Sequence, residues 1–289
     1  MQILSTTGFP GYALLDSGDG QRLEKVHQWL FVRPDPQCIW QPNLPVSRWR
    51  GVDAKFIKNN SRKEGWQFSH NIPDSWEMRY QKLTWQAKCT PFKHLGFFPE
   101  QHLHWDWMRQ RLLSVRSQAK VLNLFGYTGI ATIACAAVGA HVTHVDASKP
   151  TLTWARKNAD LSQLRDAPIR WIPDDCLKFV AREVKRQQTY DAIIMDPPAY
   201  GHAPDGKPWD FMKDFPELLK YCVSLLSDKP LFLLINAYAI SASPLMLENL
   251  LRQLTAMRGG AVTVGELCLQ EQSSRRYLLS TGMFARWTL

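Results

Sequence analysis

The decapeptide Lys120-Val-Leu-Asn-Leu-Phe-Gly-Tyr-Thr-Gly129 decides the fold predicted for this 289-residue chain. Its first half is apolar, as in a buried strand, and its second half is a glycine-containing turn. A stretch of small residues from Ile130 to Val138 follows and predicts a helix. Strand, turn and helix in this order indicate the first βα unit of a doubly wound α/β sheet, whose ligand crevice lies at the carboxyl ends of the strands.

Two further strands are predicted to end at the same crevice. The strand His141–Val145 ends on Asp146, and the strand 190–195 delivers Asp196-Pro197-Pro198-Ala199-Tyr200 at its carboxyl end. An acid at the end of the second strand can bind both ribose hydroxyls of a nucleoside, and glycines let the backbone approach it closely. The alternative for Asp146 is the N-cap of the following helix.

The glycine spacing argues against a dinucleotide. From Gly126 the chain has G-Y-T-G-I-A, whereas a dinucleotide site requires G-x-G-x-x-G and a phosphate loop requires G-x-x-x-x-G-K-[ST]. A cofactor with ribose and adenine but no pyrophosphate fits better, and S-adenosylmethionine is the common one. The chain resembles the class I S-adenosylmethionine-dependent methyltransferases from about Phe97 to its C-terminus. It looks most like the bacterial 23S ribosomal RNA enzymes that make 5-methylcytosine and 7-methylguanine.

The rest of this region alternates strands with helices, which predicts a mostly parallel sheet. The last two strands, 261–270 and 276–286, are joined by a turn too short for a crossover and are expected to be antiparallel. The resemblance implies a seven-stranded, doubly wound Rossmann-like sheet with an antiparallel last strand. We therefore expect residues 96–289 to form a methyltransferase catalytic domain.

Residues 1–95 are expected to form a small β-rich domain, because short alternating runs are separated by turn clusters. Lys55 to Lys63 is basic and polar and is predicted to be an exposed loop. Aromatic residues interleaved with Arg and Lys can stack on unpaired bases, but a small β domain also needs large side chains in its core. The domain is thus either an RNA-contacting module or a structural one. Six of the twelve tryptophans lie here: Trp29, Trp40, Trp49, Trp66, Trp76 and Trp85.

The charge of the chain favours a polyanionic partner. The net charge is +9, and residues 1–95 hold 13 Lys and Arg against 8 Asp and Glu, a net +5. Basic proteins bind nucleic acid by neutralising phosphates and releasing counterions. RNA, in particular ribosomal RNA, is therefore the expected partner.

Cysteine usage and hydropathy suit a cytoplasmic protein. The six cysteines are scattered without a C-x-x-C pair, which argues against a zinc site and a disulfide framework, and no metal is expected. The chain lacks an apolar run of about 18 residues and a signal pattern at its start, so no membrane association is expected. The oligomeric state stays open.

The resemblance implies the cofactor site residue by residue. Asp146, with Ala147 beside it, would take the ribose hydroxyls. Asp175 would accept from the adenine amino group, with the Cys176 amide at the ring edge, whereas Asp174 has helix capping as its alternative. The segment 96–101 resembles one that closes over the cofactor, which adds Phe98 and Gln101. The loop after the first strand would cradle the methionine and ribose parts: Asn123, Phe125, Gly126, Tyr127, Thr128 and Gly129.

The Asp-Pro-Pro motif carries the expected chemistry. Methyl transfer is an in-line displacement, so the enzyme mainly positions the nucleophile. The resemblance implies that Asp196 and the Pro197 carbonyl orient a base at the cofactor and that Tyr200 stacks on it. Relatives that make 5-methylcytosine carry a cysteine nucleophile at the end of the next strand, but this chain has Asn236-Ala237-Tyr238 there. Direct transfer without a cysteine is therefore expected. Methylation of a protein or small molecule, and a non-catalytic RNA-binding role, are the alternatives.

Overall fold

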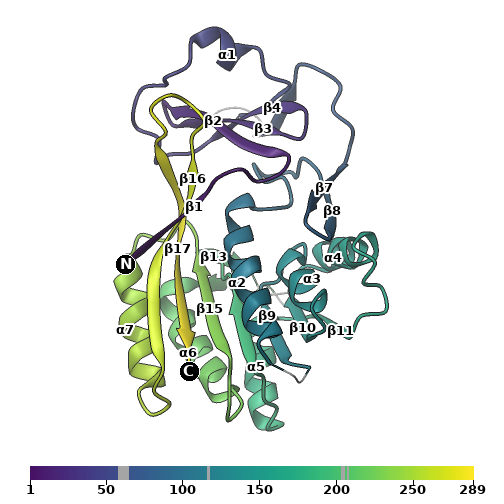
Figure 1. The fold of residues 1–289 in the computed structure, drawn as a ribbon, viewed down its shortest axis with the longest axis vertical. Helices are drawn as coiled ribbons and strands as arrows, with labels where there is room; N and C mark the ends of the chain where they lie inside the picture. Colours follow the sequence, from purple (N-terminus) through teal and green to yellow (C-terminus); the bar gives the residue numbers. More distant parts are fainter. Residues whose placement is uncertain (58–64, 116–117, 203–205, 207) are drawn as a thin grey trace. The chain divides into compact units, whose positions relative to one another are not determined.

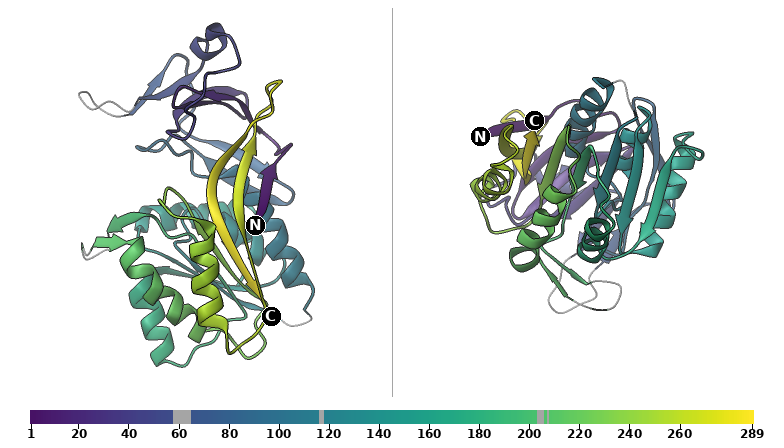
Figure 2. Two further views of the ribbon diagram at one scale, coloured as in Figure 1. Left: turned by 90° about the vertical axis from the view of Figure 1, so that its left-hand side faces the viewer. Right: turned by 90° about the horizontal axis from the view of Figure 1, so that it is seen from below.

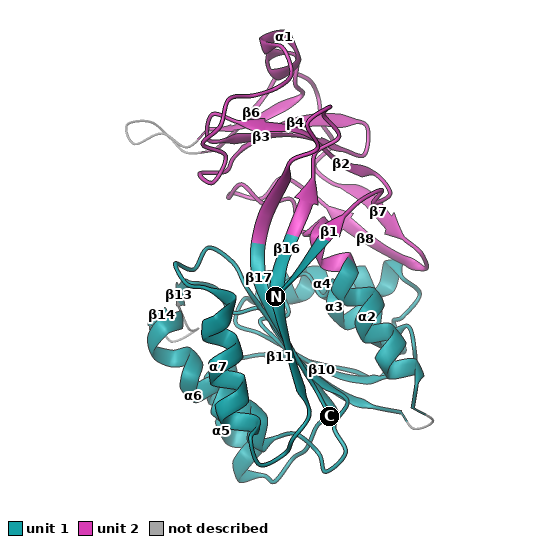
Figure 3. Ribbon diagram, turned by 60° about the vertical axis from the view of Figure 1, so that its left-hand side comes forward, with its two compact units in different colours: residues 1–4, 103–267, 282–289 teal, residues 5–102, 268–281 magenta. Residues whose placement is uncertain are grey.

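The computed structural model describes residues 1–57, 65–115, 118–202, 206 and 208–289. Contacts between Cα atoms divide the chain into two units (Figure 3). Unit 1 comprises residues 1–4, 103–267 and 282–289, and unit 2 comprises residues 5–102 and 268–281. Because residues 268–281 belong to unit 2, no single boundary along the chain separates the two units.

Unit 1 is built on an eight-stranded sheet with the order β1-β16-β17-β15-β12-β9-β10-β11 (Figure 1). Neighbours from β11 to β15 pair in parallel, and β17 pairs antiparallel with β15. The extra strand compared with the expected seven is β1, which joins the edge beside β16. The strands are β1 (Gln2–Thr6), β9 (Lys120–Leu124), β10 (His141–Asp146), β11 (Ile169–Pro173), β12 (Ala192–Met195), β15 (Phe232–Ala237), β16 (Ala261–Gln270) and β17 (Leu278–Thr288).

Helices cover both faces of this sheet (Figure 2). Leu122, Leu124 and Ile193 point into a core with the helices α5 to α7. The other face carries α2 to α4; Trp107 of α2 packs 5.0 Å from Phe232, and Asn123 bonds to Thr132 of α3. The helices are α2 (His102–Leu113), α3 (Ile130–Ala136), α4 (Lys149–Leu161), α5 (Cys176–Lys185), α6 (Phe211–Ser224) and α7 (Pro244–Thr255).

Unit 2 contains a five-stranded sheet with the order β2-β3-β4-β5-β6 and the hairpin β7–β8. Its charged centre is the carboxylate of Glu24, which accepts from Tyr12 Oη and from Nε and Nη2 of Arg33. The elements are β2 (Tyr12–Gly18), β3 (Gln21–Val26), β4 (Trp29–Pro34), α1 (Val46–Arg50), β5 (Ala54–Ile57), β6 (Gly65–Phe68), β7 (Trp76–Tyr80), β8 (Leu83–Ala87) and the 3-10 helix η1 (Pro99–Gln101).

The tryptophans of unit 2 serve mainly packing. Trp29, Trp76 and Trp85 are buried, which confirms the core interpretation for these three. The other three are half-buried, and each indole N–H has a hydrogen-bond acceptor. Trp40 donates to Ser17, Trp49 to Asp16 and Trp66 to Thr90.

The basic segment Lys55 to Lys63 was expected to be a loop, and this is wrong for its start. Lys55 lies in β5, where it pairs with Gln67 of β6, and the neighbouring Phe56 is buried. The alternation of Ala54, Lys55, Phe56 and Ile57 is that of a half-buried strand, which the lysine content obscured. Residues 58–63 lie outside the described part of the chain. Across the described residues, no helix is long and apolar enough to cross a membrane.

Candidate functional site

The loop after β9 is fixed by hydrogen bonds to the ends of its neighbours. The Phe125 amide donates to Cys176 Sγ at 3.3 Å, and the Gly126 amide donates to the Val145 carbonyl at 3.1 Å. The Tyr127 amide donates to Asp146 Oδ2 at 2.8 Å. Phe125 and Tyr127 have φ angles of 54° and 49°, unusual for residues other than glycine. Such strained backbone persists only where its surroundings hold it, which is typical of ligand sites.

The two glycines of this loop are required by the protein's own packing. A Cβ on Gly126 would lie 2.3 Å from Cε1 of His144. Gly129 has a φ of 80°, and its Cβ would lie 2.8 Å from the Cβ of Ala155. These glycines were expected to allow close approach of a nucleoside, but contacts with β10 and α4 already account for them.

A neutral polar chain lies beneath the loop. Asn123 Nδ2 donates to Thr132 Oγ1 at 2.8 Å, and Thr132 Oγ1 lies 2.8 Å from His144 Nδ1. All three side chains are buried, and burial lowers the pKa of His144 to about 3, so its imidazole is neutral. Asn123 therefore has a structural partner within unit 1.

Asp146 links the end of β10 to the loop after β9. Besides the Tyr127 amide, its carboxylate accepts from the Ser148 amide at 2.9 Å, through Oδ1. The N-cap of α4 is Ser148, whose Oγ accepts from the Thr151 amide, so the capping alternative for Asp146 is wrong. Burial raises the pKa of Asp146, and the two amides oppose that rise. The adjacent Ala147 is half-buried.

The residues present fit the ribose of S-adenosylmethionine. Each oxygen of Asp146 accepts one backbone bond in the structure, and a carboxylate oxygen has two acceptor positions. Both oxygens thus retain capacity for one hydroxyl each, and the group is only half-buried. Thr128 closes the opposite side of the loop, where its carbonyl accepts from Asn158 Nδ2 at 2.8 Å.

The acids after β11 have structural partners. Asp175 is the N-cap of α5, and its Oδ1 accepts from the Lys178 amide at 2.7 Å. Asp174, for which capping was the alternative, instead pairs with Arg182. Cys176 is buried, and its thiol receives the Phe125 amide and lies 3.9 Å from the Val145 carbonyl. The role of Asp175 and the Cys176 amide at adenine stays a prediction.

The Asp-Pro-Pro segment is tied to the β9 loop through Trp209. The Trp209 indole donates to the Pro198 carbonyl at 2.7 Å, and its ring packs 5.2 Å from that of Phe125. The Asp196 amide donates to the Leu124 carbonyl at 3.4 Å. Pro197 is buried, while Tyr200 is 78% exposed. An exposed ring at a rigid strand exit is available to stack on a planar group.

The loop after Tyr200 begins and ends as a two-stranded ribbon. The strand β13 (Tyr200–His202) pairs antiparallel with β14 (Pro208–Asp210), with Tyr200 opposite Asp210. Strands of three residues have too few positions for a periodic pattern, so no strand was predicted here.

Asn236 is a site residue that the sequence analysis recognised only as the replacement for a cysteine. Met195 pairs with Ile235, so Asp196 and Asn236 follow side by side at the carboxyl ends of β12 and β15. Strand alternation turns Asn236, which lies within β15, away from the core face that holds Ile235. Asn236 is 6% exposed, and its Oδ1 has no hydrogen-bond partner within the described chain. A buried acceptor of this kind costs free energy until a donor reaches it.

Phe98 and Gln101 belong to unit 2, whereas the other candidate residues belong to unit 1. Phe98 precedes the first turn of η1, and its ring lies 5.4 Å from that of His94. The Gln101 amide donates to the Phe98 carbonyl at 3.1 Å. Their contact with a cofactor stays a prediction. In the part of the chain that the structure describes, no cluster of His, Cys, Asp and Glu is arranged to hold a metal ion.

Comparison with curated proteins finds ribosomal RNA enzymes. The chain is 31% identical over 156 residues to the ribosomal RNA large subunit methyltransferase K/L of Magnetococcus marinus. It is 36% identical over 145 residues to the enzyme of that name from Shewanella oneidensis. These matches cover 51% and 49% of this chain but only 20% and 19% of those proteins. The chain thus spans about a fifth of their length. No family model matches it.

Comparison with solved structures covers the whole chain. A SAM-dependent methyltransferase from Agrobacterium tumefaciens is 38% identical, with a TM-score of 0.95 over 100% of this chain and 93% of that one. A methyltransferase from Streptococcus mutans shares the fold at 16% identity, with a TM-score of 0.72 over 98% and 76%. At that identity only the fold is comparable. The similarity to the Agrobacterium protein extends over both units. Because of this similarity, the chain belongs to the S-adenosylmethionine-dependent methyltransferases.

Proposed function

We propose that this enzyme methylates a base in ribosomal RNA by direct transfer. The observation that carries the proposal is the pair of strand ends at β12 and β15, where Asp196 stands beside Asn236 and its unpartnered Oδ1. Two hydrogen-bond acceptors suit an amine-bearing base. The similarity to ribosomal RNA large subunit methyltransferases supports the choice of RNA over a protein or small molecule. Action on ribosomal RNA would place the reaction in the cytoplasm.

The cofactor would bind across the ends of β9, β10 and β11. Asp146 would accept from the ribose hydroxyls, Phe125 to Gly129 would enclose the ribose and methionine parts, and Asp175 with Cys176 would contact adenine. Phe98 and Gln101 are further candidates for cofactor contact. When bound, the sulfonium supplies an electrophilic methyl group.

The target base would be held at the end of β12. Asp196 and the Pro197 carbonyl would orient its amine, and Asn236 Oδ1 would accept a further N–H from it. Tyr200 would stack on its face, which its exposure permits. The Trp209 bond to the Pro198 carbonyl restrains the turn, so the acceptors keep their direction before the base arrives.

A cysteine nucleophile does not enter this scheme. Asn236 occupies the strand end where related 5-methylcytosine enzymes carry the thiol. Cys176 and Cys222 are buried, and burial raises the pKa of both thiols far above the neutral range. A buried, protonated thiol is a poor nucleophile.

The seven strands β9 to β12 and β15 to β17 would form the catalytic sheet, with β17 as its antiparallel last strand and β1 as an addition. Residues 96–289 would carry catalysis, and residues 1–95 would contact RNA through their excess of positive charge.

The test is mass spectrometry of nucleosides from ribosomal RNA of cells with and without the gene. One methylated base should disappear without the gene, and purified enzyme should restore it. Base stacking contributes about 1–3 kcal/mol, so Tyr200→Ala should lower the methylation rate roughly 5- to 150-fold, whereas Tyr200→Phe should keep it. Cys176→Ser and Cys222→Ser should keep activity. An unchanged nucleoside profile, with methyl transfer to a protein or small molecule instead, would exclude RNA as the substrate.

A further inference from the structure

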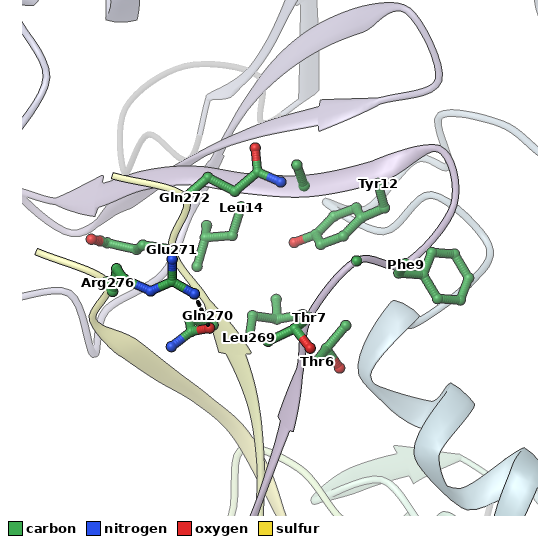
Figure 4. A pocket seen from close by; sticks show the side chains of 12 residues that line it. Thr6, Thr7, Phe9, Tyr12, Leu14, Leu269, Gln270, Glu271, Gln272 and Arg276 are labelled. Atoms are coloured by element: carbon green, nitrogen blue, oxygen red, sulfur yellow. Dashed lines mark hydrogen bonds between the residues drawn. The ribbon is translucent and has the colours of Figure 1, made fainter. Parts of the chain in front are cut away.

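Unit 2 contains a cavity of about 380 Å³ that the methyl-transfer site does not use (Figure 4). It lies between residues 6–14, which lead from β1 into β2, and residues 269–276 at the tip of the β16–β17 hairpin. Both segments belong to the same unit. The volume lies in the range of small-ligand pockets.

The walls of this cavity are preformed by backbone pairing and apolar packing. The Gln272 amide donates to the Leu14 carbonyl at 2.8 Å, and Leu14 forms a parallel bridge with Glu271. Tyr12, Leu14 and Leu269 line the cavity in Figure 4, and the Tyr12 hydroxyl is held by Glu24 at 2.7 Å. The cavity therefore requires little ordering when a ligand enters.

The lining of the cavity holds one acid, the buried Glu271, and one base, the exposed Arg276, so the charge exposed at its opening is positive. Glu271 lines it, but its carboxylate accepts from Ser273 Oγ at 2.7 Å and from Arg275 Nε at 2.9 Å, so its charge is compensated. Arg276 is exposed and donates to the neutral Gln270 at 3.1 Å. Across the described residues, no carboxylate lies within ion-pair distance of Arg276, and its positive charge stands at the opening.

A buried hydroxyl in the lining also lacks a partner. Thr6 is 5% exposed, and its Oγ1 has no hydrogen bond to any described residue. A buried polar atom without a partner is uncommon in folded proteins, and a ligand or water in the cavity would supply one. The exposed Thr7 and Gln272 add further hydrogen-bonding groups to the same cavity.

We propose that this cavity holds one unpaired nucleotide of the RNA substrate. Arg276 would bind its phosphate, because a guanidinium suits phosphate oxygens. Thr6 and the glutamine amides would hydrogen-bond the base edge, and Tyr12 with Leu14 would contact its apolar surface, as in proteins that bind splayed-out bases. The proposal rests on RNA being the substrate, and it gives unit 2 a defined contact with that RNA.

Two variants separate charge from shape. Arg276→Gln removes the cation, and Ala13→Phe fills the cavity without changing charge, since Ala13 lines it. Arg48→Gln is the matched control, because Arg48 is an exposed arginine of α1 in the same unit. Thermal melting and S-adenosylhomocysteine affinity should stay at wild-type values in all three variants.

Binding is measured with a 23S ribosomal RNA transcript over a salt series. A charge-assisted bond contributes about 1.5–3 kcal/mol, so Arg276→Gln should weaken binding roughly 10- to 150-fold and flatten the salt slope by about 0.7. Ala13→Phe should weaken binding about tenfold with the slope unchanged, and Arg48→Gln by less than about twofold. Equal losses in Arg276→Gln and Arg48→Gln would mean diffuse electrostatic attraction and would overturn the proposal. Wild-type binding in Arg276→Gln would overturn it even if Ala13→Phe fails to fold.

Calorimetry with cytidine and adenosine 5′-monophosphates keeps this result separate from the enzymatic function. Wild-type protein should bind them saturably, with inorganic phosphate as a weaker competitor, and Ala13→Phe should abolish binding. Methylation of RNA with no effect of either cavity variant would reject the cavity alone. Nucleotide binding at the cavity without any methylation of RNA would reject the ribosomal RNA substrate alone.

Discussion

The two units each bury a polar cluster, and the two clusters are built in opposite ways. In unit 2, Arg22 and Arg33 flank Glu24, with Arg33 Nε 2.6 Å from Oε2. In unit 1, Asn123, Thr132 and His144 form a neutral chain that ends at His144 Nε2, which lacks a partner among the described residues. One cluster pairs full charges, and the other contains none.

The two clusters also differ in the charge state of their central group and in the segments that they contact. Burial alone would raise the pKa of Glu24, but Arg22 and Arg33 hold it at about 2, so the pair stays ionised and fixes β3 against β4. Burial keeps His144 neutral under the loop that carries Asp146. This chain adds no charge beside Asp146, whose carboxylate accepts from two backbone amides. In this protein the charged cluster joins two strands of unit 2, whereas the neutral chain lies beside the loop that is predicted to bind the cofactor.

The largest expected effect is on the charged cluster. Glu24→Ala would leave two buried guanidinium groups without their carboxylate, which typically costs about 3–5 kcal/mol. Urea denaturation should therefore give a free energy of unfolding lower by that amount. Glu77→Ala is the control, because the Glu77–Arg79 pair is exposed and its loss should change stability by less than about 0.5 kcal/mol. Equal small losses in both variants would contradict the role of the cluster.

Acid should act through the same carboxylate. The folded-state pKa of Glu24 is about 2, below its ordinary value of 4.5. Its contribution is therefore complete above pH 4.5 and is lost as the pH falls from 4.5 to 2, by up to about 3 kcal/mol. Urea midpoints between pH 7 and pH 3 should fall more steeply for wild type than for Glu24→Gln. Parallel curves would argue against an ionised Glu24 in the folded protein.

The ligand-facing acid above the neutral chain comes next. Asp146→Ala should lower S-adenosylhomocysteine affinity about a hundredfold, since charge-assisted bonds to both ribose hydroxyls contribute roughly 2–3 kcal/mol. Calorimetry measures this loss directly. Asp160→Ala is the control, because Asp160 is an exposed acid in α4 that pairs with Arg165. Unaltered affinity in Asp146→Ala would refute the ribose assignment, and robust NADH binding by wild type would refute the choice of cofactor.

The smallest expected effect tests how the neutral chain supports the loop. Gly126→Ala would push a methyl group into the His144 ring, and overpacking of this kind costs about 1–3 kcal/mol. Denaturation should show that loss, and Gly126→Ala with His144→Ala should lose less than the sum of the two single changes. Gly51→Ala is the control, because its Cβ would meet only Ser47 O, at 3.4 Å. Additive losses would mean that the ring does not hold the loop.

The sequence predicted the parts of the fold that follow from local pattern. The strand that begins at Lys120 and the acids after 145 and 195 were placed correctly, because apolar runs and strand order determine them, although the strand ends at Leu124. It missed β1, whose place depends on pairing with residues about 260 positions away. Likewise, the contact between Gly126 and His144 and the unpartnered Oδ1 of Asn236 arise only when strands come together. The roles of the predicted site residues at a cofactor await the measurements above.

The division of the chain has a consequence for how this enzyme can be altered by recombination. Unit 2 is encoded in two stretches, 5–102 and 268–281, and the second supplies Arg275, which pairs with Asp16 at 2.9 Å. A gene fragment for residues 5–102 alone would leave Asp16 without its partner Arg275. Removal of that fragment would leave Glu271 without its hydrogen bond from Ser17. Exchange with a relative must therefore replace both stretches together, so the two stretches of unit 2 are expected to be inherited jointly.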